Sequence, residues 1–295
     1  MTTMVFGFPG HDELAATLIG RLGGSRGELE LRRFPDGECY VRLATPVAGR
    51  TVVLACGLHR ADERLLPLVF AAAAAKELGA ASVGIVAPYL GYLRQDKRFQ
   101  PGEAVTSATF AKIVSGFADW LVTVDPHLHR YRALGEIYSM RTAIVHAAAA
   151  LSAWIRAQVG VPLLVGPDAE SEQWVAEVAR GADAPYVVME KNRRGDRDVE
   201  VTAPGIEAHG GRTPVLVDDI ISTAGTMIAA VRHLRRLGMP APVCIGVHAI
   251  FADDAYAELK AAGAARVVTC NTIAHASNAI DLNGAIADRV AELAR

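Results

Sequence analysis

The residues Val215-Leu216-Val217-Asp218-Asp219-Ile220-Ile221-Ser222-Thr223-Ala224-Gly225-Thr226 decide the fold of this chain. The apolar residues before Asp218 are typical of a strand that is covered on both faces. Residues 227–237 carry apolar side chains at helical spacing. Between them, the small residues 222–226 predict a tight loop whose backbone N–H groups and helix terminus suit a phosphate dianion. The sequence therefore predicts a strand, a phosphate loop and a helix, in that order.

Two adjacent acids stand where the predicted strand ends. Asp218 and Asp219 would face sugar hydroxyls or a metal that arrives with the substrate. The alternative is a plain connection between a strand and a helix. We favour a sugar phosphate site because paired carboxylates at a strand end are costly without cations or hydroxyl donors beside them.

Strand-like and helix-like runs alternate along the whole chain. The strand-like runs are residues 51–56, 83–87, 121–124, 162–165, 215–217 and 243–247, and the helix-like runs are residues 65–78, 108–117, 172–180 and 227–237. Such alternation predicts an α/β fold with mainly parallel sheets flanked by helices.

The second half of the chain echoes the first. Arg50-Thr51-Val52-Val53-Leu54 resembles Arg212-Thr213-Pro214-Val215-Leu216, which lies roughly 160 residues later. The echo predicts two similar domains, residues 1–145 and 146–295. A cleft between such domains is the natural place for a site that binds two substrates.

Composition narrows the class of protein. A net charge of -2 argues against a general nucleic-acid binder, so any cationic site must be local. The four cysteines are too widely spaced for a compact disulfide framework. The amino terminus lacks a signal-peptide pattern, and the apolar run 65–75 is too short to cross a bilayer. We therefore expect a cytoplasmic protein without membrane or nucleic-acid partners.

A turn near the amino terminus joins an aromatic ring to two acids. In Phe34-Pro35-Asp36-Gly37-Glu38, the ring could stack on a base while a carboxylate accepts a hydrogen bond from an exocyclic amine. The alternative is a solvated turn with one anchored aromatic residue.

A basic loop follows the strand predicted at residues 83–87. Loops at the carboxyl ends of parallel strands carry ligands, and Arg94, Lys97 and Arg98 offer cationic groups for a polyphosphate. An exposed basic loop without a ligand is the alternative.

Two further strand ends carry candidate metal or phosphate ligands. In Val124-Asp125-Pro126-His127-Leu128-His129, His127 could orient a hydrated magnesium ion or contact a phosphate, whereas we expect a structural role for His129. Asp168 lies in the corresponding turn Gly166-Pro167-Asp168-Ala169.

The polar run Glu190-Lys191-Asn192-Arg193-Arg194 could close over phosphates during their transfer. Lys191 and Arg193 would then supply positive charge where negative charge develops. The alternative is a charged hairpin exposed to solvent.

Taken together, these runs resemble the ribose-phosphate pyrophosphokinase family across almost the full chain. FPDGE, PYLGYLRQDK, VDPHLH, GPDA, EKNRR and VDDIISTAGT follow in the family's order and spacing, and Cys270-Asn271-Thr272-Ile273 resembles its C-terminal segment. The resemblance implies two type I phosphoribosyltransferase-like domains. It implies that the last helix of the chain packs back on the N-terminal domain. It also implies transfer of the β,γ-diphosphoryl group of ATP to the C1 hydroxyl of ribose 5-phosphate, which yields AMP and phosphoribosyl diphosphate for nucleotide biosynthesis.

The resemblance also assigns roles to individual residues. It implies ATP contacts from Phe34, Asp36, Gly37, Glu38, Arg94, Gln95 and Asp96. It implies ribose 5-phosphate contacts from Arg193, Asp218, Asp219, Ser222, Thr223, Ala224, Gly225 and Thr226. Lys191 and Arg193 match the catalytic loop, and His127 and Asp168 match positions associated with Mg2+. The family further implies a homo-oligomer in which neighbouring subunits share the ATP site.

The chain departs from the family at Glu170-Ser171, where glycines are common. Glu170 adds bulk and negative charge close to the presumed phosphates. Two alternatives stay open. A type I phosphoribosyltransferase would share VDDIISTAGT but would not need FPDGE, RQDK or EKNRR. A noncatalytic relative that assembles with active synthetases should have lost residues of the catalytic loop or residues associated with Mg2+. This chain keeps both sets.

Overall fold

The computed structural model describes residues 2–194 and 198–294, and the described side chains exclude Glu170 and residues 191–201. The chain divides into two compact units. Unit 1 comprises Met1–Val145 together with Asn283–Arg295, and unit 2 comprises His146–Leu282.

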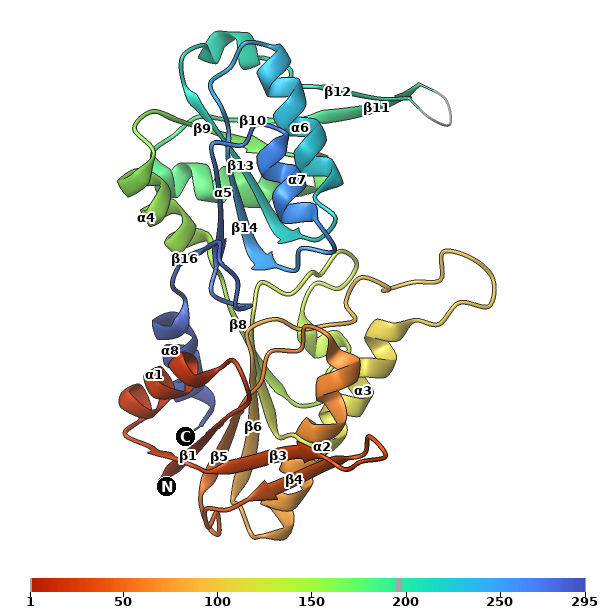
Figure 1. Cartoon of the computed structure of the whole chain (residues 1–295), viewed down its shortest axis with the longest axis vertical. Coiled ribbons are helices and arrows are strands. Elements are labelled where there is room, and N and C mark those ends of the chain that lie inside the picture. The colour runs from red at the N-terminus through yellow and green to blue at the C-terminus, as the bar shows by residue number, and fades with distance from the viewer. Residues whose placement is uncertain (1, 195–197, 295) are drawn as a thin grey trace. The chain divides into compact units, whose positions relative to one another are not determined.

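Unit 1 is built on a six-stranded sheet in the order β2-β1-β5-β6-β7-β8 (Figure 1). Every neighbouring pair in it is parallel. Its strands are β1 (Thr3–Gly7), β2 (Ser25–Arg26), β5 (Thr51–Ala55), β6 (Ser82–Ala87), β7 (Trp120–Val124) and β8 (Arg141–Val145). Residues 52–55 are completely buried because helices cover both faces of the sheet, which explains the near-continuous apolar runs.

The helices of unit 1 form a layer on each face of its sheet. They are α1 (Asp12–Leu22), α2 (Ala61–Glu77), α3 (Thr106–Phe117) and α8 (Asn283–Leu293), with the short 3-10 helix η1 (Leu134–Glu136). Helix α1 contacts α8, and α2 contacts α3. An antiparallel hairpin of β3 (Leu29–Arg33) and β4 (Cys39–Leu43) lies against α2 (Figure 1).

One glycine makes room for the largest buried side chain of unit 1. A Cβ atom at Gly84 in β6 would lie 2.0 Å from the ring of Trp120 in β7. Trp120 is fully buried, and its Nε1 donates a hydrogen bond to Oγ of Ser82 at 3.2 Å. The neighbouring strands can pair only because position 84 has no side chain.

Helix α8 brings the end of the chain into unit 1. It contacts α1, β7 and β8, and it buries Ile286 and Val290. On the surface, Nε of Arg21 in α1 donates a hydrogen bond to Oδ1 of Asp288 at 2.6 Å. The last helix therefore completes the core of the first unit.

Unit 2 contains a second six-stranded parallel sheet, in the order β10-β9-β13-β14-β15-β16. Its strands are β9 (Pro162–Gly166), β10 (Tyr186–Val188), β13 (Thr213–Ile221), β14 (Val243–Ala249), β15 (Arg266–Cys270) and β16 (Asn278–Ile280). Its helices are α4 (Ala148–Gln158), α5 (Glu172–Ala182), α6 (Gly225–Arg236) and α7 (Ala255–Ala261), with the 3-10 helices η2 (Ala169–Ser171) and η3 (Ile206–His209). The antiparallel hairpin of β11 (Glu190–Arg194) and β12 (Asp198–Thr202) extends away from this sheet (Figure 1).

The two units share one topology. In each, the first two strands of the sheet are followed by an antiparallel hairpin, and the remaining four strands then extend the sheet in chain order. The predicted α/β fold with two similar, mainly parallel domains is confirmed. None of the helices in the described ranges combines the length and the apolarity that crossing a bilayer needs.

Candidate functional site

The two central acids lie inside a strand rather than after it. The sequence predicts the strand at residues 215–217, but β13 continues to Ile221. The prediction of its end is wrong because the parallel neighbour β14 goes on pairing with it: Asp218 lies opposite Gly246, and Ile220 lies opposite His248. The two acids are therefore the sixth and seventh of the nine residues of β13 and belong to the sheet.

Negative charge is concentrated around Asp218. Burial raises the pKa of its carboxyl to about 8, with further contributions from the charge of Asp219 and, more weakly, that of Asp168. The backbone N–H of Asp219 donates a hydrogen bond to Oδ1 of Asp218 at 2.9 Å. The structure thus brings three predicted site residues together, in an environment that a cation or hydroxyl donors would stabilise.

The loop that follows β13 has the geometry of an anion site. Ala224 adopts the left-handed conformation with φ 57°, and α6 begins at Gly225 without a side-chain cap. Its first backbone N–H groups and the positive end of its dipole therefore face the loop. Backbone hydrogen bonds hold the start of this loop. The N–H of Phe251 donates to the carbonyl of Ile221 at 2.9 Å, and the N–H of Ala252 donates to the carbonyl of Ser222 at 3.2 Å.

Gly225 is not required by packing within the protein. Among the described residues, a Cβ atom there would meet only Oγ1 of Thr223, at 3.9 Å, which is an ordinary contact. The missing side chain instead leaves the backbone open to close approach from outside. That is the arrangement expected of a loop that binds phosphate through its amides.

The segment expected to close over phosphates forms a hairpin. Its backbone register pairs Lys191 with Val201 and Arg193 with Val199. The side chains of Lys191 and Arg193 lie outside the described residues, as does that of Glu170.

In unit 1, Phe34 stands in the turn between β3 and β4. Its N–H donates to the carbonyl of Glu38 at 2.8 Å, and Gly37 donates to the carbonyl of Phe34 at 2.9 Å. Gly37 has φ 95°, a conformation that favours glycine. Phe34 is 40% exposed as a residue, and the guanidinium of Arg32 lies 4.7 Å from the centroid of its ring. The turn therefore holds Phe34 as a partly exposed aromatic residue beside Arg32.

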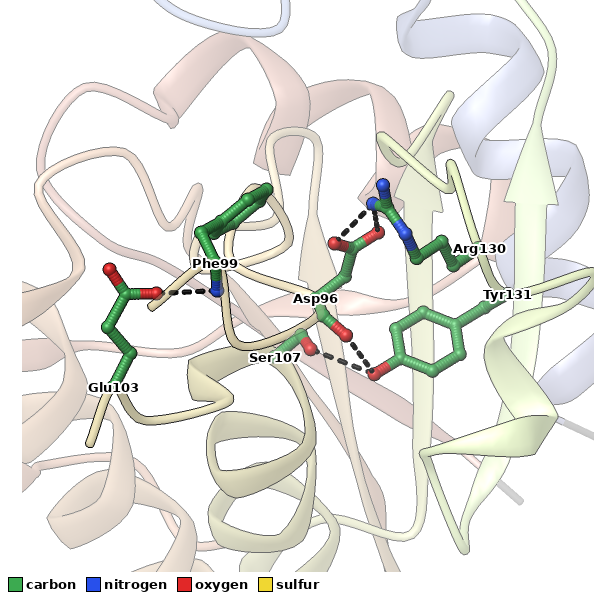
Figure 2. Close-up of polar contacts among 6 residues, drawn as sticks. All are labelled: Asp96, Phe99, Glu103, Ser107, Arg130 and Tyr131. Carbon is green, nitrogen blue, oxygen red and sulfur yellow. Dashed lines mark hydrogen bonds and ion pairs between the residues drawn. The ribbon is translucent and has the colours of Figure 1, made fainter. Parts of the chain in front are cut away.

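The loop after β6 contains an ion pair that sequence analysis missed. Arg94 is exposed and Gln95 partly buried, but Asp96 is buried. Its carboxylate accepts two hydrogen bonds from Nη1 of Arg130, at 2.7 and 2.9 Å (Figure 2). Arg130 follows VDPHLH directly, yet nothing in its sequence position identifies this partner.

The candidate metal residues belong to different units. His127 is half-buried beyond β7 in unit 1, where its ring meets that of His129 edge to face with centroids 3.9 Å apart. Asp168 lies beyond β9 in unit 2. Within the described residues, no three or more His, Cys, Asp or Glu side chains are grouped so as to hold a metal ion. A Mg2+ ion here would depend on substrate phosphates for several of its ligands.

Comparisons with known proteins agree with this arrangement. Residues 3–116 match the N-terminal domain of ribose phosphate pyrophosphokinase, and residues 135–283 match the phosphoribosyl transferase domain. A ribose-phosphate pyrophosphokinase of Methanopyrus kandleri is 34% identical, covering 95% of this chain and 96% of the relative. The ribose-phosphate pyrophosphokinase of Methanobrevibacter smithii is 30% identical, and the match covers 97% of this chain and 99% of that relative.

A solved structure shares the whole fold. The phosphoribosylpyrophosphate synthetase of Mycobacterium smegmatis superposes with a TM-score of 0.85 at 22% identity, and 99% of each chain is covered. The match to both family domains also separates the chain from a lone phosphoribosyltransferase, which would lack the first. Both halves of the sequence, with their motifs in order, thus show that the chain belongs to the ribose-phosphate pyrophosphokinase family.

Proposed function

We propose that this protein is a ribose-phosphate diphosphokinase. It transfers the β,γ-diphosphoryl group of ATP to the C1 hydroxyl of ribose 5-phosphate and releases AMP. The observation that carries this proposal is the geometry of the loop after β13 in unit 2, where α6 starts without a side-chain cap just beyond the Asp218–Asp219 pair. Named relatives whose matches cover 97% and 95% of this chain support the same activity.

The acceptor binds at unit 2 in this proposal. Backbone N–H groups of residues 222–226 and the hydroxyls of Ser222, Thr223 and Thr226 hold the 5-phosphate. Carboxyl oxygens of Asp218 and Asp219 accept hydrogen bonds from the ribose hydroxyls.

The donor ATP binds at unit 1. Phe34 stacks on the adenine, and Asp36 or Glu38 accepts a hydrogen bond from its amine. Arg94 and Gln95 contact the phosphates.

The reaction needs positioning more than covalent chemistry. The C1 oxygen attacks the β-phosphorus, the bond from that phosphorus to the α-phosphate oxygen breaks, and AMP leaves with the electron pair. The hydroxyl proton passes to solvent, and no bond to the protein forms. Lys191 and Arg193 stabilise the charge that develops on the transferring phosphates.

The donor set is compatible with Mg2+ held largely by phosphates. Asp168 and His127 are its candidate protein ligands, and the charge that raises the pKa of Asp218 is the kind that a divalent cation relieves. When bound, the ion neutralises phosphate oxygens during transfer.

A second copy of the chain completes the donor site in this proposal. The exposed apolar side chains of unit 1 include Leu66 and Phe70 in α2 and Ile113 in α3, which are 45–56% exposed. Such side chains favour a protein interface. The hairpin that carries Phe34 would then serve a neighbouring subunit.

The test is to mix purified protein with ATP, magnesium and ribose 5-phosphate and to identify the products by phosphorus NMR. AMP and a C1 diphosphate should form only when the sugar is present. Formation of ADP would indicate an ordinary kinase, and ATP binding without turnover would indicate a noncatalytic relative.

A further inference from the structure

Asp96 is held inside unit 1 from several directions. Its side chain is only 2% exposed. The hydroxyl of Tyr131 donates to its carbonyl at 3.5 Å and also bonds with Oγ of Ser107, at 3.0 Å, in the first turn of α3 (Figure 2). The N–H of Ser107 donates in turn to the carbonyl of Gln95 at 3.3 Å. A carboxylate fixed and buried in this way is poorly placed to contact a ligand.

Arg130, by contrast, is half exposed. Both of its hydrogen bonds to Asp96 come from Nη1, while 47% of the side chain remains accessible. Among the described residues, Nη2 and Nε of Arg130 have no partner, and Figure 2 shows the second terminal nitrogen directed away from the carboxylate. A guanidinium has five N–H donors, so most of them stay available. The buried carboxylate of Asp96 therefore orients the guanidinium of Arg130 and leaves most of its N–H donors available to a ligand.

The surroundings of Arg130 favour a polyphosphate. The loop that carries it follows β7, and the loop that carries Arg94 follows the adjacent parallel strand β6. Both loops therefore leave the same edge of the sheet. Lys97, Arg98 and Arg132 in these loops are exposed as well. Exposed cationic side chains on two loops that follow adjacent strands, in a chain of net charge -2, suit a ligand with several negative charges.

We propose that Arg130 is a direct ligand of the donor's β- and γ-phosphates and that Asp96 is the residue that positions it, not an ATP contact. This inference rests on the proposed function, because it takes ATP as the ligand of unit 1. A planar cation held in advance by a buried carboxylate loses little freedom when it binds an oxyanion.

The test compares three variants: Arg130→Ala, Asp96→Asn and the double variant. ATP and AMP are titrated by calorimetry in magnesium buffer without ribose 5-phosphate, so no turnover is needed. Arg130→Ala should weaken ATP binding by about 10- to 100-fold and leave AMP binding unchanged. Asp96→Asn should weaken ATP binding less, because the guanidinium is still present. Arg141→Ala, at the amino end of β8, removes one exposed charge from the same unit and should change neither affinity.

The double variant separates a ligand from a structural partner. Arg130→Ala leaves a buried carboxylate unpaired and can disturb the loop for that reason alone. The double variant removes that charge, so it should still bind ATP as weakly as Arg130→Ala does. Recovery of ATP affinity, or an equal loss of AMP affinity, would overturn the inference. Absence of phosphoribosyl diphosphate in the NMR assay would refute the proposed function alone, because these titrations measure binding only.

Discussion

The Asp218 carboxyl makes the stability of the fold depend on pH. Its pKa is about 8 in the folded chain, against 3.8 for an ordinary aspartate. The folded state therefore keeps a proton that the unfolded state releases, and stability falls as the pH rises from about 4 to about 8. Asp218→Asn removes this loss. From about pH 4 to about pH 8, the difference in free energy of unfolding between Asp218→Asn and the unmodified chain should therefore grow in favour of the variant. It should grow by at most about 1.4 kcal/mol per pH unit.

Urea denaturation at several pH values measures this difference. Asp254→Asn changes an exposed acid of the same unit and should run parallel to the unmodified chain. A gap between Asp218→Asn and the unmodified chain that stays constant with pH would contradict the raised pKa.

Gly225 tests the phosphate loop without disturbing the fold. Gly225→Ala adds a methyl group that makes no contact closer than 3.9 Å with the part of the chain that the structure describes, so the thermal midpoint should stay the same or rise slightly. The KM for ribose 5-phosphate should rise by about tenfold or more, because the methyl group enters the space of the phosphate. Gly284→Ala, in the first turn of α8, is the matched control. If the KM for ribose 5-phosphate is unchanged in both variants, the loop of residues 222–226 does not bind the 5-phosphate.

Residues whose role depends on a local run were predictable, and residues whose role depends on a distant partner were not. The turn at Gly37 and the small residues after Ile221 carry their geometry in their own sequence. Asp96 and Arg130 lie 34 positions apart, and only the packing of two loops makes them a pair. The family resemblance assigned Asp96 to ATP, and the sequence could not show that its side chain is buried against Arg130.

At the scale of elements, the six predicted strand runs correspond to central strands of the two sheets: β5, β6 and β7 in unit 1, and β9, β13 and β14 in unit 2. Strands such as β5 and β14 are buried along their whole length and mostly apolar, because both faces of the sheet are covered. The hairpin strands β3 and β11 are rich in charged residues, and β2 has two residues, so hydrophobicity alone gives little signal for them. The extra length of β13 was missed because its last residues include two acids.

The β11–β12 hairpin should act on the transition state. Lys191→Ala should lower kcat by about 100-fold and change the KM for ATP much less, because its charge is needed where the phosphates carry most charge. Steady-state kinetics measure both constants. Lys260→Ala in α7 removes an exposed lysine of the same unit and should leave both unchanged. A normal kcat for Lys191→Ala would exclude the catalytic assignment.

At the scale of the whole molecule, the last helix supports the first unit. Ile286→Ala removes a buried side chain of α8 and should lower the stability of unit 1 by about 3 kcal/mol. Asp288→Ala breaks only an exposed ion pair and should cost less than about 1 kcal/mol. With Trp154 and Trp174 replaced by Phe, the fluorescence of Trp120 reports on unit 1 alone. Equal effects of the two variants would show that α8 adds little to that core.

The position of α8 also sets the order in which a newly made chain can fold. Multidomain proteins generally fold their first domain while the rest is still being synthesised. Here unit 2 is complete once Leu282 has left the ribosome, but unit 1 still lacks the helix that covers α1, β7 and β8. The first unit to be made is therefore the last to close. Any chain that stops before Asn283 would carry a finished second unit and a first unit with its apolar face uncovered.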